Sequence, residues 1–273
     1  MGKIVAFWSS VHGQPGTTSN MIALATITAM EHECKCLLMQ THFKMNSLEA
    51  YLIGSRESSR DIFMDIGIDG LARSIKLEPL NEQIIENHTI PLWNQRLTLL
   101  PGTTIENSEL FRYDMAKTIV KIMTEAKKYY DLIFIDSNSG SDEISKLVLS
   151  QADLIAVNLC QNKSVLDHHF STWRLKEHKL MYLIGSYHKD SSYNLHNLKA
   201  LYRPFRRTPL SIIPYNVGFM DSLSGGKVMK YMSRNISIKQ SGEDTYFMNC
   251  VREASDRLIR LINDKRGGMA VGS

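Results

Sequence analysis

The chain has 273 residues, which is long for one domain but within the range of a large α/β fold. Hydrophobic residues make up 43% of it and charged residues 22%, as in ordinary soluble globular proteins. The net charge of +4 is mild, so composition alone does not indicate a nucleic-acid-binding or membrane-surface protein. No run approaches the roughly 18 apolar residues that a membrane-spanning helix needs.

The four cysteines, Cys34, Cys36, Cys160 and Cys250, do not follow the spacing of a zinc site. One residue separates Cys34 from Cys36, whereas a zinc half-site usually has about two to four, and no second pair follows. We therefore expect reduced, structural thiols and no metal bound by these cysteines. Because residues 1–3 lead directly into a strand-like stretch without a secretory signal, we expect a cytoplasmic protein.

The first part of the chain predicts a strand, a loop, a helix and a second strand. Residues 4–8 are a short apolar run, typical of a buried parallel strand. Residues 20–30 contain Ala and Leu with few helix breakers, which favours a helix, and residues 36–39 are the next strand. Such a βαβ unit requires a right-handed crossover.

The rest of the chain continues this alternation after a less regular stretch. Residues 43–95 predict helices and loops over one sheet edge, with a turn at 91–93. Alternating apolar strands and helical segments predict an α/β fold with a doubly wound, mainly parallel β-sheet flanked by helices. We expect one domain over 1–264 and a flexible tail over 265–273. The further strands are expected at 97–100, 131–136, 154–159, 181–184 and 210–214, and the further helices at 114–128 and 247–262.

The loop between the first strand and the first helix is the candidate phosphate-binding site. It reads His12-Gly13-Gln14-Pro15-Gly16-Thr17-Thr18-Ser19. A glycine-rich turn at this point directs backbone N–H groups inward, and the helix N-terminus adds its positive dipole end. Gly13 and Gly16 allow a phosphate to approach closely. The hydroxyl of Thr18 or Ser19 can cap the helix or ligate Mg²⁺.

This loop departs from the usual P-loop pattern, Gly-x-x-x-x-Gly-Lys-Ser/Thr. With Gly16 as the second glycine, Val11 holds the first glycine position and Thr17 holds the lysine position. On the loop alone, a capped turn without a ligand stays an alternative.

A carboxylate at the end of another strand strengthens the prediction. Asp136 ends the most hydrophobic strand of the chain, where a P-loop fold places a second group of the magnesium shell. With residues 137–140 behind it, Asp136 gives Asp-x-x-x-Gly, in which the Gly140 amide can sense a terminal phosphate. An aspartate at a strand end is also a common turn former. Its combination with the loop predicts a nucleotide site.

Together these segments resemble the ParA/MinD superfamily of positioning ATPases, P-loop NTPases with a deviant loop, over residues 3–263. The family loop Lys-Gly-Gly-Val-Gly-Lys-Thr-Thr lies over 12–19, and 130–140 is similar to the family's Tyr-Asp-x-Ile-Ile-Ile-Asp-x-Pro-Pro-Gly. Residues 151–157 are similar to its Ala-Asp-x-Val-Ile-x-Val strand, and 212–216 to its adenine-side segment. This last segment resembles the branch that includes the pilus-assembly proteins TadZ and CpaE.

The resemblance implies a homodimer that holds ATP or ADP with Mg²⁺ between its two subunits. It implies that Thr18 ligates magnesium directly and that Asp136 does so through water. The residues that it places at the nucleotide are His12, Gly13, Gln14, Pro15, Gly16, Thr17, Thr18, Ser19, Gly140, Pro214 and Tyr215.

The departures from the family pattern concern hydrolysis more than binding. His12 replaces the signature lysine that crosses to the partner, and Thr17 replaces the loop lysine. Gln40 stands where an aspartate is taken to orient the attacking water, and Gly185 where an asparagine often contacts the base. Losing one group that stabilises phosphoryl charge commonly costs about 3–4 kcal/mol in the barrier. Backbone amides bind without these side chains, so we expect binding with slow or absent hydrolysis.

Three functional hypotheses follow for this site. The first is a nucleotide-binding positioning or regulatory factor for a secretion, pilus or conjugation machine. The second is a non-catalytic pseudo-ATPase scaffold that acts by protein contacts. The third is a DNA-partition ATPase, which rests on two basic groups that can bind phosphate backbones non-specifically. Those groups are Arg203, Arg206 and Arg207, and Lys227, Lys230 and Arg234.

Two smaller expectations concern the closing helix and the histidines. The closing helix, with Arg252, Arg257 and Arg260 on its polar side, is expected to dock on the sheet, with membrane association as the alternative. A protonated His12 can partly replace the signature lysine, although a solvent-facing loop residue is the favoured interpretation. We interpret His42, His168 and His169 as ordinary surface or loop residues.

Overall fold

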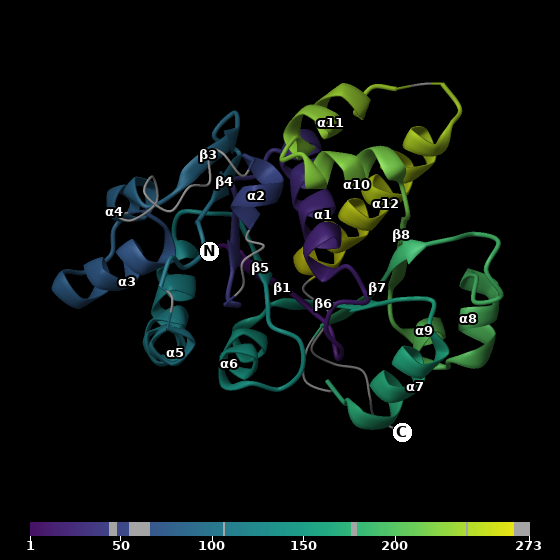
Figure 1. Cartoon of the computed structure of the whole chain (residues 1–273), viewed down its shortest axis with the longest axis horizontal. Coiled ribbons are helices and arrows are strands. Elements are labelled where there is room, and N and C mark those ends of the chain that lie inside the picture. Colours follow the sequence, from purple (N-terminus) through teal and green to yellow (C-terminus); the bar gives the residue numbers. More distant parts are fainter. Residues whose placement is uncertain (44–47, 55–65, 106, 176–178, 239, 265–273) are drawn as a thin grey trace.

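The computed structural model describes residues 1–43, 48–54, 66–105, 107–175, 179–238 and 240–264. They form an eight-stranded sheet in the order β3-β4-β2-β5-β1-β6-β7-β8, in which β3 pairs antiparallel to β4 and every other neighbouring pair is parallel (Figure 1). The predicted doubly wound, mainly parallel sheet is therefore confirmed. The strands are β1 (Lys3–Trp8), β2 (Cys36–Gln40), β3 (Ile90–Trp93), β4 (Leu97–Leu99), β5 (Leu132–Asp136), β6 (Leu154–Leu159), β7 (Leu180–Tyr187) and β8 (Leu210–Pro214).

Helices cover both faces of this sheet. The period of two along a strand divides β1 between two cores: Ile4 and Trp8 face one, and Val5 and Phe7 face the other. Helices α5, α6 and α7 pack on the first core, and α1, α10, α11 and α12 on the second. The helices are α1 (Thr17–Glu31), α2 (Leu48–Leu52), α3 (Gly67–Leu77), α4 (Glu82–Asn87), α5 (Ser108–Ala126), α6 (Glu143–Gln151), α7 (Lys163–Thr172), α8 (Leu195–Leu201), α9 (Pro204–Arg207), α10 (Val217–Ser224), α11 (Val228–Asn235) and α12 (Glu243–Asn263).

The segment from Pro91 to Trp93 is an edge strand, so the predicted turn there is wrong. Pro91 lacks an N–H group, which an edge strand tolerates because one of its sides makes no ladder hydrogen bonds. The reversal comes directly afterwards, where Asn94 and Gln95 have φ of 40° and 59°. The remainder of the irregular region supplies α2, α3 and α4 in the residues that the structure describes.

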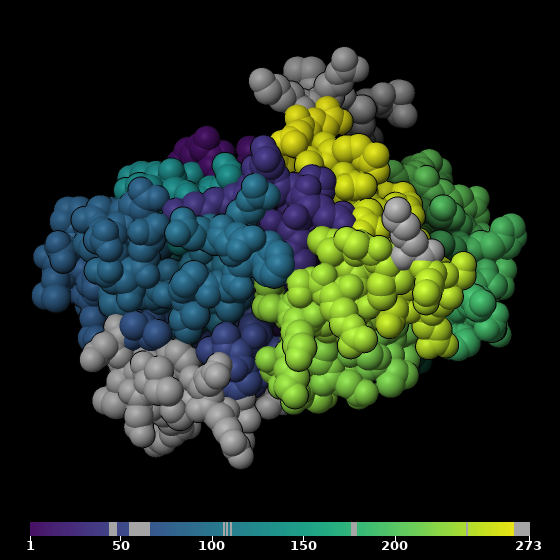
Figure 2. Space-filling model, turned by 90° about the horizontal axis from the view of Figure 1, so that it is seen from above, coloured from purple at the N-terminus to yellow at the C-terminus, as the bar shows by residue number. Residues whose placement is uncertain are grey.

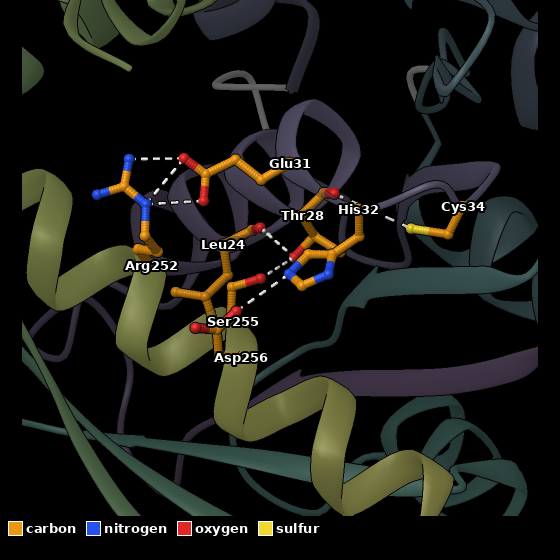
Figure 3. A network of polar contacts seen from close by, with 8 residues as sticks. All are labelled: Leu24, Thr28, Glu31, His32, Cys34, Arg252, Ser255 and Asp256. Carbon is orange, nitrogen blue, oxygen red and sulfur yellow. Dashed lines mark hydrogen bonds and ion pairs between the residues drawn. The ribbon is translucent and has the colours of Figure 1, made fainter. Parts of the chain in front are cut away.

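The closing helix α12 docks on α1 and on the sheet, as expected. Its apolar side, which includes Phe247, Val251 and Leu258, is buried in the second core. Polar pairs join α12 to the last turn and the C-cap of α1: Arg252 to Glu31, Ser255 to Thr28 and Asp256 to His32, as Figure 3 shows. This apolar face is therefore occupied by protein and is not available to a bilayer.

Figure 2 shows α10, α11 and α12 as one continuous part of the surface, beside the exposed part of α1. Among the residues that the structure describes, no helix combines the length and the apolar character that crossing a bilayer requires.

His169 is a core residue, and its interpretation as a surface or loop histidine is wrong. Its ring lies 6.2 Å from that of Trp8 and 5.9 Å from that of Tyr182, and the residue is 2% exposed. Burial, with a smaller contribution from His168, lowers the pKa of His169 to about 4. The ring is therefore neutral in the folded protein at neutral pH, and α7 carries it on its buried side.

This burial predicts acid sensitivity between pH 6.5 and 4. The unfolded state binds a proton that the folded state excludes, so stability is full above the unfolded pKa and falls as the pH drops towards the folded pKa. At pH 5 the loss from this one group is about 2 kcal/mol relative to pH 7.5. Urea unfolding measures the free energy of unfolding at both pH values. The difference between pH 7.5 and pH 5 should be smaller in His169→Phe than in the wild-type protein by about that amount. His196→Gln, at an exposed position on α8, is the matched control. An unchanged pH difference in His169→Phe would contradict this account.

Candidate phosphate-binding site

The loop between β1 and α1 adopts the conformation that its glycines permit. Gly13 has φ of 79°, and Gly16 lies in the left-handed region with φ of 66° and ψ of 39°. Helix α1 begins directly after Gly16, three residues before the predicted start at Asn20. Gly16 is the N-cap and has no side chain to accept from the first-turn N–H groups. The helix N-terminus therefore retains its donors and its dipole for a ligand.

The underside of the loop packs against the sheet through Asn20 of α1, Asn158 of β6 and Gly185 of β7. Asn20 Nδ2 donates to the carbonyl of Pro15 at 3.1 Å and to Asn158 Oδ1 on β6 at 2.8 Å. Gly185 on β7 allows this approach, because a Cβ there would lie only 2.2 Å from the Pro15 oxygen. This contact explains the glycine at a position where the family often has a base-contacting asparagine. The loop itself occupies the space.

Above the strand ends lies a cavity of about 480 Å³. At its base, Thr18 Oγ1 donates to Asp136 Oδ2 at 2.6 Å, and Asp136 is 2% exposed. The two residues meet because β1 and β5 are parallel neighbours, with Phe7 opposite Asp136. The cavity is lined by His12, Gly13, Pro15, Gly16, Thr17, Thr18, Ser19, His42, Tyr51, Asp136, Ser137, Asn138, Ser139, Met220, Leu223 and Ser224.

His42 lies in the loop after β2, as interpreted, but it is buried and lines this cavity instead of facing solvent. It is 8% exposed, and its Nε2 lies 3.9 Å from Asp136 Oδ2. The signal that could have located it is its place two residues beyond β2. Gln40 at the end of β2 lies opposite Asp136 at the end of β5, so the residues after both strands reach the same edge. A lone histidine carries no such information by itself.

Gln40 is turned away from the cavity. It is 3% exposed, its Oε1 accepts from the backbone N–H of Leu48 at 3.0 Å, and its amide packs against Gly102. The side chain thus anchors the start of α2 to the sheet.

Two further hydroxyl-bearing residues line the cavity, and sequence reasoning gave neither a role there. Ser137 Oγ is buried and has no hydrogen-bond partner among the described residues. Burial and the Asp136 charge raise the pKa of the Tyr51 phenol. With Thr18, Ser19 and Ser139 they give the cavity a lining rich in hydroxyl oxygens.

Four of the predicted site residues lie outside the cavity lining. The amide of Gly140 donates to the Ser9 carbonyl at 3.0 Å. Gln14 Oε1 accepts from Asn162 at 3.4 Å, on the side of α7. Pro214 ends β8, and the 55% exposed Tyr215 follows it, with its N–H bonded to the carbonyl of Tyr187. Helix α10 instead supplies Met220 and Leu223 to the cavity, which no motif indicated.

The two basic groups do not form one surface. Arg203 and Arg207 belong to the α8–α9 region, whereas Lys230 and Arg234 lie on α11, well apart from it in Figure 1. Arg206 donates to the carbonyls of Lys199 and Ala200 and so caps the end of α8. This separation gives no continuous basic stripe for a duplex in the described residues.

The fold is a mainly parallel α/β sheet with a glycine loop after its first strand, and structural comparison shows that ParA and MinD ATPases share this fold. A ParA family ATPase from Chlorobium tepidum superposes with a TM-score of 0.69 at 14% identity, over 94% of this chain and 98% of that one. The cell division ATPase MinD of Pyrococcus furiosus gives 0.68 at 16% identity, over 94% and 100%. MinD of Pyrococcus horikoshii, complexed with Mg-ADP, gives 0.67 at 16%, over 97% and 100%. The predicted fold class is therefore confirmed.

These likenesses concern the fold alone, because the sequences are so different. No family matches the sequence, and no curated protein matches it.

The packing of the loop on β7 predicts that Gly185→Ala is destabilising. The added methyl group would collide with a backbone oxygen, which cannot move without displacing the loop, and overpacking of this kind costs about 1–3 kcal/mol. Gly242→Ala is the matched control, since a Cβ there meets nothing within 4 Å. Thermal unfolding of both variants measures the difference. Equal melting temperatures would show that the loop is not seated on the strand as described.

Proposed function

We propose that this chain is a ParA/MinD-like nucleotide-binding protein that takes ATP or ADP with Mg²⁺ in the cavity between the 12–19 loop and β5. The observation that carries the proposal is the pair formed by Thr18 Oγ1 and Asp136 Oδ2, 2.6 Å apart at the base of that cavity. A hydroxyl from the first turn of the loop helix and a carboxylate from a neighbouring strand end are the oxygen donors that a P-loop site offers to magnesium.

The donor set fits magnesium bound together with phosphates. Among the described residues no group of three or more His, Cys, Asp or Glu could hold a metal ion alone. Mg²⁺ rarely uses such a cage: it keeps waters and binds through one or two carboxylates plus substrate phosphates. Thr18 and Asp136 would hold it here, and the buried Ser137 hydroxyl would gain a polar partner. The bound ion would neutralise phosphate charge.

Backbone groups carry most of the phosphate binding in this proposal. The uncapped N-terminus of α1 and the glycines of the loop supply N–H donors and a positive dipole end. Thr17, half-buried in the cavity wall, cannot supply the charge of a lysine. The predicted loop ligands that line the cavity are thus His12, Gly13, Pro15, Gly16, Thr17, Thr18 and Ser19.

Slow or absent hydrolysis is part of the proposal. Gln40 is engaged by the Leu48 amide and does not face the cavity, and an amide cannot act as a general base. His42 occupies the cavity edge instead, 3.9 Å from Asp136. These contacts favour nucleotide as a ligand that sets the conformation of the protein, rather than as a substrate that turns over.

The proposed role is a homodimeric positioning or regulatory factor for a secretion, pilus or conjugation machine. Its support comes from proteins that share the fold: a ParA family ATPase, a plasmid partition protein of Borrelia burgdorferi bound to AMPPNP, and a MinC:MinD cell division complex of Aquifex aeolicus. The resemblance of residues 212–216 to the TadZ/CpaE branch favours the pilus machinery, and we place the protein in the cytoplasm. The engaged Gln40 favours a pseudo-ATPase scaffold as the second candidate.

Calorimetric titration with ATP tests the magnesium site. We expect binding that is at least tenfold tighter with Mg²⁺ than without it, and we expect Asp136→Asn to lose that difference, since the ion then lacks its charged ligand. Asp190→Asn, at an exposed loop position, is the matched control. Light scattering with and without nucleotide reads the oligomeric state in the same samples. Intact protein that binds no ATP at millimolar concentration would refute the proposal and leave the empty scaffold.

Restoring the missing lysine tests the phosphate position. Thr17→Lys places an ammonium group in the cavity wall, and a charge-assisted hydrogen bond to phosphate contributes about 1.5–3 kcal/mol, or roughly ten- to hundredfold in affinity for ATP. Gln14→Lys adds the same charge to the same loop outside the cavity lining, so it should change affinity much less. Equal effects of the two variants would mean that net charge alone attracts the nucleotide.

A further inference from the structure

Two cysteines lie side by side at the opposite end of β2 from the phosphate site. Cys36 is the first residue of β2 and is completely buried, and Cys34 precedes it at a half-buried position. Their two Sγ atoms lie 3.5 Å apart. This separation is a hydrogen bond between thiols, about 1.5 Å longer than a disulfide bond.

Cys34 opens onto a surface hollow, whereas Cys36 does not. The hollow has a volume of about 480 Å³, and Lys3, Glu33, Cys34, Lys127 and Tyr130 are among the residues that line it. The Cys34 thiol also lies 4.0 Å from the carbonyl of Thr28 in the last turns of α1, a contact drawn in Figure 3. One residue of the pair therefore borders a hollow at the surface, while the other is buried.

The pair differs electronically from the other two cysteines. The hydrogen bond from the Cys36 thiol lowers the pKa of Cys34, and that same bond together with burial raises the pKa of Cys36. Burial raises the pKa of Cys160, and it raises that of Cys250 to about 11. Since the thiolate is the nucleophile in thiol exchange, these pKa directions favour Cys34 over the other three cysteines as the attacking group.

We propose that Cys34 and Cys36 form a reversible modification site, in which Cys34 reacts with small-molecule disulfides of the glutathione class and Cys36 resolves the product into a Cys34–Cys36 disulfide. In the first step the Cys34 thiolate attacks oxidised glutathione, a mixed disulfide forms and one glutathione thiolate leaves. In the second step Cys36, losing its proton to that thiolate, attacks the Cys34 sulfur, and a second glutathione thiolate leaves. The protein loses two electrons and two protons, and oxidised glutathione becomes two reduced molecules.

A metal is the weaker explanation of the same pair. Two thiols alone do not complete the four-ligand shell of zinc, and no group of three or more candidate ligands occurs among the described residues. The unequal exposure of the two sulfurs is what a sequential exchange needs, with one attacking thiol and one covered resolving thiol.

The test is exposure of the purified, reduced chain to excess oxidised glutathione, followed by tryptic mapping without reductant. Lys35 lies between the two cysteines, so trypsin separates residues 4–35 from 36–44, and only a disulfide keeps these peptides joined. We expect the joined pair in the wild-type protein and its disappearance on adding dithiothreitol. In Cys36→Ser, the resolving thiol is lost and a persistent glutathione adduct on Cys34 is expected.

The remaining cysteines provide the control, and the folded state is checked in each variant by circular dichroism. Cys34→Ser should stay unmodified at Cys36, and Cys160→Ser with Cys250→Ser should leave the joined peptides unchanged. Faster modification of Cys160 or Cys250 than of Cys34 would overturn the proposal. So would a Cys36→Ser protein whose Cys34 stays free of adduct.

Discussion

The parallel pairing of β5 between β1 and β2 fixes the candidate site. Asp136 at the end of β5 lies opposite Phe7 on one side and Gln40 on the other, so three chain segments leave the sheet at one edge. The first turns into the glycine loop, and the others carry Ser137 and His42 to the cavity. Ligands of open α/β sheets bind at such carboxyl ends. The contact between Thr18 and Asp136 is therefore a consequence of the strand order. The position of either residue in the site follows only when the position of its strand in the sheet is known.

The balance of charge in the cavity distinguishes this site from a P-loop with its lysine. A buried carboxylate lies at the base, and Thr17 supplies no opposing charge. A bare triphosphate would meet the negative Asp136 with loop N–H dipoles but no lysine to hold it, whereas a bound magnesium ion would reverse the local potential. The same argument separates binding from turnover in the proposed site. Dipoles that are fixed by the loop would bind ground-state phosphates, whereas the charge that develops on the leaving group would need a cation, and Thr17 offers none at the lysine position.

Local pattern in the sequence was sufficient for elements whose signal lies within the element. The apolar run at β5 and the glycines of the loop are examples, and both are found where they were predicted. The Pro91–Trp93 strand was missed because proline usually argues against a strand, and only its place at the sheet edge removes that objection. Likewise His42 and His169 carry no periodic signal. One faces the cavity and the other the core because of tertiary packing, which no window of neighbouring residues contains.

Gly185 shows how a residue can be misread when it is compared with a family pattern alone. Its lack of a side chain looks like the loss of a base contact. In the structure, however, the Pro15 carbonyl occupies the space where a side chain of residue 185 would lie. Gly140 and Tyr215 were predicted at the nucleotide but lie outside the cavity for a similar reason. The amide of Gly140 donates to the Ser9 carbonyl, and the amide of Tyr215 continues the pairing of β8 with β7. Motif alignment gives the order of residues along the chain, whereas hydrogen bonds already made decide which groups are left for a ligand.

Helix α1 extends this constraint from the loop to the far edge of the sheet. The residues from Asn20 to Ala29 are all buried, so the helix has no solvent face in its middle and is enclosed by the sheet and α12. A helix that is packed on every side cannot tilt or slide without opening a cavity, which costs several kcal/mol for each large side chain that it uncovers. Its N-terminus is therefore held in place beside Asp136 before any ligand arrives. Its other end is tied through Thr28 to Ser255 and to the Cys34 sulfur. The packing of the core, rather than a ligand, therefore sets the distance between the loop and the Asp136 carboxylate. Backbone donors cannot change position as a flexible lysine side chain can, so the proposed site depends more on this fixed geometry.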